Sequence, residues 1–260
     1  MVEIKNVCAG YGKCEVLHNI NLKLFKGQVT TLIGANGSGK STLLKTLLGF
    51  LPLMGGEIRL DGISTQNFSR EKLARKIAYL PQGKSVPDIT AERMVLYGRF
   101  PYLSYPRKYR AQDIAIAQQA MKRMGIAELA EKPMAKLSGG MRQKVYIAMA
   151  LAQQADVIVM DEPTTYLDIG QQLKFAGLIK QLSADGKTIL LVLHDLPLAF
   201  KISEQIVVIE NGVVAECGTA EQILKSGIIE RICGVVVKST TTQAGVQYFY
   251  DLDALPSISI

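Results

Sequence analysis

The chain has 260 residues, of which 48% are hydrophobic and 20% charged, the balance of a globular protein with a sizeable buried core. No apolar run reaches the roughly 18 residues of a membrane span, and no secretory signal pattern opens the sequence, so we expect a cytoplasmic chain. The net charge of +7 would suit an anionic partner, but no nucleic-acid-binding motif accompanies it. The four cysteines lack metal-type spacing, and we interpret them as reduced thiols.

Short apolar runs alternate with helical patterns along the chain, which is typical of an α/β fold with a largely parallel sheet. Residues 2–7 and 57–62 alternate between apolar and polar side chains and predict half-exposed antiparallel strands. Continuous apolar runs at 29–33, 157–160 and 188–193 predict buried strands instead.

The middle of the chain, residues 87–155, is mostly helical in pattern and predicts a helical lobe inserted into the α/β lobe. Gly125 is placed to end one of its helices. The apolar face of that helix is expected to consist of Ile114, Ala117, Met121 and Met124.

The last part of the chain contains two hairpin signals. Asn211-Gly212 stands between two strand-like runs, and alternating runs follow Gly234 on both sides of a polar turn. The predicted domains are therefore an α/β lobe of residues 1–86 and 156–234, a helical lobe of residues 87–155, and a small β appendage of residues 235–260.

The clearest motif is GANGSGKST, which contains G-x-x-x-x-G-K-S between a strand-like and a helical run. Glycines let backbone N–H groups converge on phosphate oxygens, and the helix that follows adds its positive end. Lys40 is expected to reach the β- and γ-phosphates, and the Ser41 hydroxyl to ligate magnesium. The motif predicts a nucleoside triphosphate site made by Gly34, Ala35, Asn36, Gly37, Ser38, Gly39, Lys40, Ser41 and Thr42.

Three further strand-like runs end in polar side chains, at the sheet edge where a parallel α/β fold presents its ligand. Successive strand residues point opposite ways, so Asp161 could hold magnesium while Glu162 reaches the attacking water. His194 could hydrogen-bond the γ-phosphate, and Gln82 could approach the magnesium or the water. The alternatives are that the two acids cap the next turn and that His194 is structural.

A second helix start suited to an anion occurs in LSGGMRQ, where Ser138 precedes two glycines. One chain with one phosphate loop and two such helix starts would use both in a symmetric dimer. The alternative is that Ser138 only caps the helix.

In this order the motifs resemble those of the ATP-binding subunits of ABC transporters, over nearly the whole chain. The resemblance implies a P-loop NTPase (RecA-like) lobe with an antiparallel β subdomain, binding ATP and magnesium. It also implies two head-to-tail copies, with Ser138, Gly139 and Gly140 of each contacting the γ-phosphate held by the other. Tyr11 would stack on the adenine, and Asp168 would belong to the nucleotide site. Met141 stands where the family usually has Gln, a change that we expect to be tolerated.

Three further stretches are similar to one branch of the family, the ATPases of iron-siderophore, haem and cobalamin importers: EPTTYLD, YGRFPYLS (residues 97–104) and the tail after Gly234. This likeness implies a peripheral ATPase at the cytoplasmic face of the membrane. Its partners would be integral membrane permease subunits and, indirectly, an extracellular or periplasmic substrate-binding protein. The alternative is a soluble assembly ATPase of the same superfamily, for example in iron-sulfur cluster biogenesis.

Overall fold

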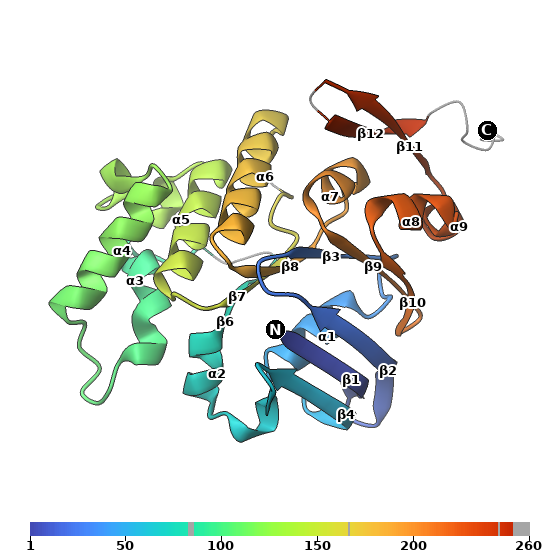
Figure 1. Cartoon of the computed structure of the whole chain (residues 1–260). Helices are drawn as coiled ribbons and strands as arrows, with labels where there is room; N and C mark the ends of the chain where they lie inside the picture. Colours follow the sequence, from blue (N-terminus) through green and yellow to red (C-terminus); the bar gives the residue numbers. More distant parts are fainter. Residues whose placement is uncertain (83–85, 166, 244, 252–260) are drawn as a thin grey trace. The chain divides into compact units, whose positions relative to one another are not determined.

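The computed structural model describes residues 1–82, 86–165, 167–243 and 245–251 (Figure 1). Tyr166 of the EPTTYLD stretch and the end of the predicted appendage lie outside the described residues. Two compact units make up the chain: unit 1 comprises residues 1–65 and 176–260, and unit 2 comprises residues 66–175. The domain boundaries predicted from the sequence stay a prediction.

Unit 1 contains an antiparallel sheet in the order β2-β1-β4-β5. Buried and exposed residues follow one another along its strands because only one face of such a sheet packs on the core (Figure 1). The antiparallel strands predicted at 2–7 and 57–62 are thereby confirmed, except that the second ends at Leu60 and residues 61–62 form a turn. The strands are β1 (Val2–Tyr11), β2 (Cys14–Leu24), β4 (Leu53–Leu60) and β5 (Ile63–Ser64).

A second group of strands in unit 1 surrounds β3 (Val29–Ile33), which pairs in parallel with β8 (Thr188–Val192) and β9 (Gln205–Glu210). Every residue of β3 and β8 is buried, as their continuous apolar runs predict. The buried Thr30 hydroxyl donates a hydrogen bond to Gln205 Oε1 at 3.0 Å. Strand β10 (Val213–Gly218) pairs antiparallel with β9, which confirms the predicted hairpin.

The helices of unit 1 are short, and the chain then forms a pair of antiparallel strands next to α7 (Figure 1). This pair confirms the predicted β appendage over the residues described. The elements are α1 (Lys40–Leu47), α7 (Leu196–Ile202), α8 (Ala220–Lys225), α9 (Ile228–Cys233), β11 (Val236–Thr242) and β12 (Gly245–Asp251).

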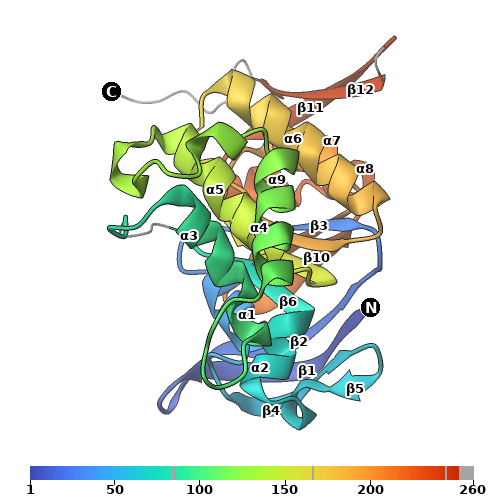
Figure 2. The ribbon, with the colours of Figure 1, turned by 90° about the vertical axis from the view of Figure 1, so that its left-hand side faces the viewer.

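Unit 2 combines a parallel strand pair with a set of helices. Strand β6 (Ile77–Leu80) pairs with β7 (Val157–Asp161), and helices α3, α4 and α5 pack on one another (Figure 2). Helix α6 (Ile169–Ala184) starts in unit 2 and ends in unit 1. The other elements are η1 (Thr65–Asn67), α2 (Arg70–Lys76), α3 (Ala91–Leu96), η2 (Tyr97–Tyr102), α4 (Ala111–Arg123), η3 (Ala127–Leu129), η4 (Met134–Lys136) and α5 (Gly139–Ala152).

The helix predicted before Gly125 is α4, and Gly125 ends it with a φ of 62°. Ala117 and Met121 are buried on its inner face as expected, but Ile114 is 38% exposed. The predicted apolar face is wrong at this residue, because the first turn of α4 turns Asp113 inward to meet a buried arginine.

Candidate functional site

The phosphate loop of unit 1 follows β3 and depends on three glycines in left-handed conformations. The φ angles of Gly34, Gly37 and Gly39 are 155°, 80° and 110°. A Cβ atom on Gly34 would lie 2.2 Å from the backbone oxygen of Ile209, and one on Gly39 would lie 2.9 Å from Leu17 Cδ2. The loop therefore requires glycine for its conformation and for the close approach of its neighbours.

Lys40, the first residue of α1, is 7% exposed and closes the loop on itself. Its Nζ donates hydrogen bonds to the backbone oxygens of Gly34 at 2.8 Å and Ala35 at 2.9 Å. The buried Ser38 hydroxyl has no hydrogen-bond partner among the described residues. The loop thus combines a buried ammonium, the Ser38 hydroxyl and the start of a helix. These groups make it chemically suited to bind phosphate.

The hairpin between β9 and β10 supports this loop. Gly212 donates its backbone N–H to the Ser38 oxygen at 3.0 Å and accepts one from His18 at 2.8 Å. The φ of Gly212 is 77°, and a Cβ atom there would lie 1.9 Å from the backbone oxygen of Val16. Sequence reasoning identified Asn211-Gly212 as a turn and missed this contact, because the turn lies far from the loop in sequence.

Tyr11 ends β1 with 47% of its surface exposed. Lys45 of α1 donates a hydrogen bond to its hydroxyl at 3.3 Å, and the same ammonium lies 5.6 Å from the ring centroid. Burial alone would raise the pKa of Tyr11, but hydrogen bonds with Thr42 and Lys45 bring that pKa below its ordinary value. The hydroxyl is thus tied to α1 while the ring remains accessible for stacking.

His194 is exposed just beyond the end of β8, as expected. The next residue, Asp195, caps α7 by accepting a hydrogen bond from the Leu198 N–H at 3.0 Å. The histidine is therefore held between a fully buried strand and a capped helix.

In unit 2, Asp161 is the last residue of β7 and is 5% exposed. Burial and the charge of Asp161 together raise the pKa of Tyr79, on the neighbouring strand β6, to about 12. Glu162 leaves the strand with a φ of 47°, a left-handed conformation that is uncommon for a residue with a side chain. A turn, and not strand alternation, therefore gives the two acids their different environments.

The Glu162 carboxylate accepts hydrogen bonds from two groups of unit 2. Gln82 Nε2 donates to its Oε2, and the Thr165 hydroxyl donates to the same oxygen at 3.3 Å. The same hydroxyl lies 3.1 Å from the backbone oxygen of Glu162, so its single proton is shared between the two oxygens. The structure thus brings the sequence-predicted Gln82 and Glu162 together, and Thr165 is an additional contact that the sequence reasoning missed.

The residues expected to hold magnesium offer oxygen atoms only: the Ser41 hydroxyl, the Gln82 amide and the Asp161 carboxylate. Oxygen is the ligand type that Mg²⁺ prefers, and protein sites for it commonly supply one or two carboxylates, with phosphates and water completing the shell. Among the described residues no group of three or more His, Cys, Asp or Glu could hold a metal by itself. The donor set therefore fits a magnesium ion that enters together with a phosphate.

The LSGGMRQ segment starts α5 in unit 2, and the exposed Ser138 is its N-cap. The Ser138 hydroxyl accepts a hydrogen bond from the Met141 N–H at 3.3 Å. Gln143, which received no role from the sequence, donates from Nε2 to the backbone oxygen of Pro163 at 2.7 Å. Capping of the helix by Ser138 is thus present, and Gln143 links α5 to the segment that follows Asp161 and Glu162.

Asp168 is exposed and accepts a hydrogen bond from the Gln171 N–H at 2.8 Å, so that it caps the start of α6. A Cβ atom on Gly140 would lie 1.9 Å from Gln171 Oε1, a buried oxygen without a hydrogen-bond partner in the described part of the chain. Glycine is therefore required at residue 140 because α6 passes close to α5.

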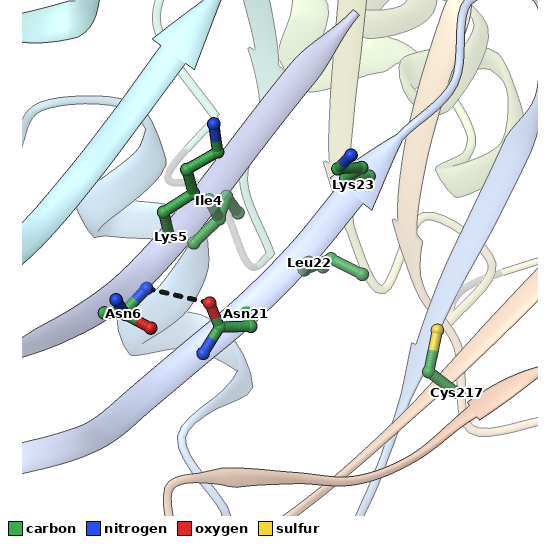
Figure 3. A pocket seen from close by; sticks show the side chains of 7 residues that line it. All are labelled: Ile4, Lys5, Asn6, Asn21, Leu22, Lys23 and Cys217. Carbon is green, nitrogen blue, oxygen red and sulfur yellow. Dashed lines mark hydrogen bonds between the residues drawn. The ribbon is translucent and has the colours of Figure 1, made fainter.

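A separate pocket of about 500 Å³ lies along β1 and β2 of unit 1 (Figure 3). At its edge Asn6 donates its backbone N–H to Asn21 Oδ1 at 3.0 Å. The two lysines that line it, Lys5 and Lys23, both pair with Glu3, at 3.2 and 3.6 Å. Both lysines are therefore paired with a carboxylate of the same sheet, and we assign no ligand to this pocket.

Comparison with known proteins gives consistent results. A family model described as "ABC transporter" matches residues 17–165. The chain is 38% identical over 248 residues to the iron(3+)-hydroxamate import ATP-binding protein FhuC of Bacillus subtilis (strain 168), covering 94% of this chain and 92% of that protein.

Solved structures show the same likeness. An inward-facing conformation of a protein described as a metal-chelate type ABC transporter matches with a TM-score of 0.83 and 25% identity, covering 96% of each chain. The dimeric structure of MJ0796, described as a bacterial ABC transporter cassette, matches with a TM-score of 0.73 and 29% identity, covering 85% of this chain and 99% of that one. These matches confirm the predicted fold class, including its RecA-like and antiparallel parts. In the part of the chain described here, no helix is long and apolar enough to cross a membrane.

Proposed function

Because the chain belongs to the ABC transporter family as its ATP-binding subunit, we propose that it hydrolyses ATP to power the import of iron(III) chelates. Siderophores are favoured over haem and cobalamin, since the name of the similar FhuC protein specifies iron(3+)-hydroxamate. The observation that carries the hydrolytic part is the Glu162 carboxylate, fixed by Gln82 and Thr165 directly after the buried Asp161. Two side-chain donors and a left-handed backbone hold this carboxylate at the end of a strand, the edge where a parallel α/β sheet presents its ligand.

In the proposed hydrolysis of ATP, each residue of the site has a separate role. The backbone N–H groups of residues 34–42 and the Lys40 ammonium bind the phosphates of ATP. Glu162 accepts the proton of the attacking water, Gln82 orients that carboxylate, and His194 donates a hydrogen bond toward the γ-phosphate. Tyr11 stacks on the adenine through its exposed ring face.

Ser41, Gln82 and Asp161 would hold magnesium. When bound, the ion would neutralise part of the phosphate charge during transfer. The negative charge of Asp161 supports this assignment. Its carboxylate is buried, and a buried negative charge is stabilised by a cation beside it.

Two copies of the chain are proposed to bind ATP between them. Ser138, Gly139 and Gly140 of one copy would contact the γ-phosphate held by Lys40 of the other, and Asp168 would lie in the same interface. The exposure of Ser138 and Gly139 supports this arrangement, as does the likeness to the dimeric MJ0796 cassette.

Unit 2 carries the surface proposed to dock integral membrane permease subunits. Three aromatic side chains of this segment are exposed: Tyr97 (44%), Phe100 (46%) and Tyr105 (96%). Beside them lies a pocket of about 650 Å³ lined by Glu71, Arg75 and residues 102–107. Such docking would hold the chain at the cytoplasmic face of the membrane and connect it indirectly to a substrate-binding protein outside.

The first test is the turnover of Glu162→Gln. We expect ATP hydrolysis to fall by about 1000-fold while ATP binding persists, because an amide cannot accept the proton. Glu128→Gln, the same change at an exposed carboxylate of unit 2, serves as the matched control and should hydrolyse ATP normally. Turnover near the wild-type rate in Glu162→Gln would refute the assignment of the base.

The second test concerns the partner and cargo. Tagged Glu162→Gln protein is purified from mild-detergent membrane extracts with and without magnesium and ATP, and the co-purifying chains are identified by mass spectrometry. A many-helix permease in stoichiometric amount is expected, together with loss of uptake of radioactive iron-hydroxamate in cells that lack this chain. Recovery of soluble partners only would indicate an assembly ATPase instead.

A further inference from the structure

Helix α7, which begins two residues after His194, is held by the C-terminal strand pair. The Leu196 N–H, at the first position of α7, donates a hydrogen bond to the Tyr250 hydroxyl of β12 at 3.1 Å. The two residues are 54 positions apart in sequence. A segment far from the nucleotide motifs in sequence thus contacts the helix start next to a proposed phosphate ligand.

Two further contacts fix the same helix to the same strand. The rings of Phe200 and Tyr248 meet edge to face with centroids 5.5 Å apart. Lys201 Nζ donates a hydrogen bond to the backbone oxygen of Val246 at 2.7 Å. Because alternate residues of a strand share a face, Tyr248 and Tyr250 both turn toward α7.

The first turn of any helix leaves N–H groups without partners inside the helix. Within α7, residues 196–199 are accounted for as follows. Leu196 donates to Tyr250, Pro197 has no N–H, Leu198 donates to the Asp195 side chain, and Ala199 donates to the Asp195 backbone oxygen at 2.9 Å. Tyr250 is the one acceptor among them that comes from outside the segment.

Tyr250 is in its neutral form when it accepts this hydrogen bond. Burial, together with the charges of Asp195 and Cys233, raises the pKa of the Tyr250 hydroxyl above its ordinary value, although the hydrogen bond from Leu196 opposes the change. The hydroxyl therefore stays neutral at physiological pH and keeps its own proton.

We propose that Tyr250 is a positioning residue for hydrolysis, which fixes the start of α7 and thereby the placement of His194. This inference rests on the proposed role of His194 at the γ-phosphate. It gives the C-terminal strand pair a function: the pair sets the geometry of the histidine from outside the nucleotide site.

The test compares full-length chains that carry Tyr250→Phe, Tyr248→Phe or His194→Ala, and the Tyr250→Phe/His194→Ala double variant. Tyr250→Phe removes only the acceptor oxygen, and we expect kcat to fall by about 10-fold with the Kd for ATP unchanged, since small misplacements of a reacting group are costly. Tyr248→Phe, which keeps its ring against Phe200, should match the wild type. In the His194→Ala background the Tyr250→Phe change should have no further effect on kcat.

Each other outcome has a definite meaning. If Tyr250→Phe lowers kcat by the same factor with and without His194, or if it lowers the thermal unfolding midpoint and the Kd together, Tyr250 acts on the fold and the inference is overturned. If His194→Ala lowers kcat but Tyr250→Phe does not, only the inference fails. If His194→Ala hydrolyses ATP at the wild-type rate, the proposed role of His194 fails first and the inference fails with it.

Discussion

Arg99 is a single buried side chain that joins three helical segments of unit 2. Its Nε donates to Asp113 Oδ1 at 3.0 Å, and its Nη1 donates to the Ala152 oxygen at 2.9 Å and to Gln154 Oε1 at 3.0 Å. The guanidinium also lies 3.9 Å from the centroid of the Tyr102 ring. A charge with 5% exposure is stable only because its donors are satisfied in this way. The arginine of the YGRFPYLS stretch therefore has a structural role, because it joins three helical segments of unit 2.

Asp113→Ala should destabilise the protein by about 3 kcal/mol at pH 7, because it leaves Arg99 buried without its counter-charge. Burial alone would raise the pKa of Asp113, but hydrogen bonds from the Arg110 N–H and from Arg99 bring that pKa below its ordinary value of 3.8. A carboxyl with a lowered pKa stabilises the fold above its unfolded pKa and loses that contribution as the pH falls. The difference in the free energy of unfolding between variant and wild type, measured by urea denaturation, should therefore become smaller below about pH 4.

Glu221→Ala is the control for this prediction, because Glu221 pairs with Lys225 at an exposed site where both side chains are 75% accessible. Its effect on stability should be much smaller than that of Asp113→Ala, because solvent screens an exposed ion pair. An equal loss of stability at the two sites would contradict this prediction, as would a loss for Asp113→Ala that does not change with pH.

At the scale of elements, two hairpins of unit 1 have nearly the same turn but different surroundings. Asn211-Gly212 has φ angles of 48° and 77°, and Asp61-Gly62 has 49° and 83°. A Cβ atom on Gly212 would collide with β2, whereas one on Gly62 would meet no atom within 4 Å. The first hairpin is also the one that donates to the Ser38 oxygen of the phosphate loop.

The variants Gly212→Ala and Gly62→Ala separate backbone strain from support of the loop. Both should lose about 1 kcal/mol of stability from the left-handed conformation, and Gly212→Ala should lose more because its Cβ atom would collide with the backbone oxygen of Val16. Only Gly212→Ala should weaken ATP binding, by about 10-fold, because the displaced turn withdraws its hydrogen bond from the loop. Titration with a fluorescent ATP analogue measures the two Kd values, and equal values would show that the hairpin does not hold the loop.

The elements of this fold were predictable from local patterns, and its long-range contacts were not. Alternation and turn residues were sufficient for β1, β4 and both late hairpins, since those signals lie within a few neighbouring residues. Gly98 illustrates the limit: a Cβ atom there would lie 2.1 Å from the Met149 oxygen, a contact that no local pattern contains. The left-handed Glu162 is a similar case, because the sequence predicts a strand that ends in two acids but contains no signal for a φ of 47° at the second one.

At the scale of the whole molecule, the phosphate loop lies in unit 1 and the LSGGMRQ segment in unit 2. In the proposed dimer, the phosphate loop of one copy meets the LSGGMRQ segment of the other. Lys40→Ala and Ser138→Arg should each abolish hydrolysis when alone. A mixture of the two should recover about a quarter of the wild-type rate, because half of the dimers are mixed and each retains one intact site.

The control for the mixing experiment is a chain with both changes, mixed with Lys40→Ala. It contains no intact combination and should remain inactive. Absence of recovery in the first mixture, with dimers confirmed by light scattering at twice the 28.4 kDa chain mass, would rule out the head-to-tail arrangement.

The pairing of β3 also has a consequence for protein synthesis. The strand that leads into the phosphate loop has β8 and β9 as its parallel neighbours, and these begin only at Thr188 and Gln205. A ribosome needs on the order of ten seconds to translate the intervening residues. During that time β3 lacks both of its partners, so the loop after it cannot hold its conformation. We therefore expect a half-synthesised chain to hydrolyse no ATP, and hydrolysis to begin only once nearly the whole polypeptide has emerged.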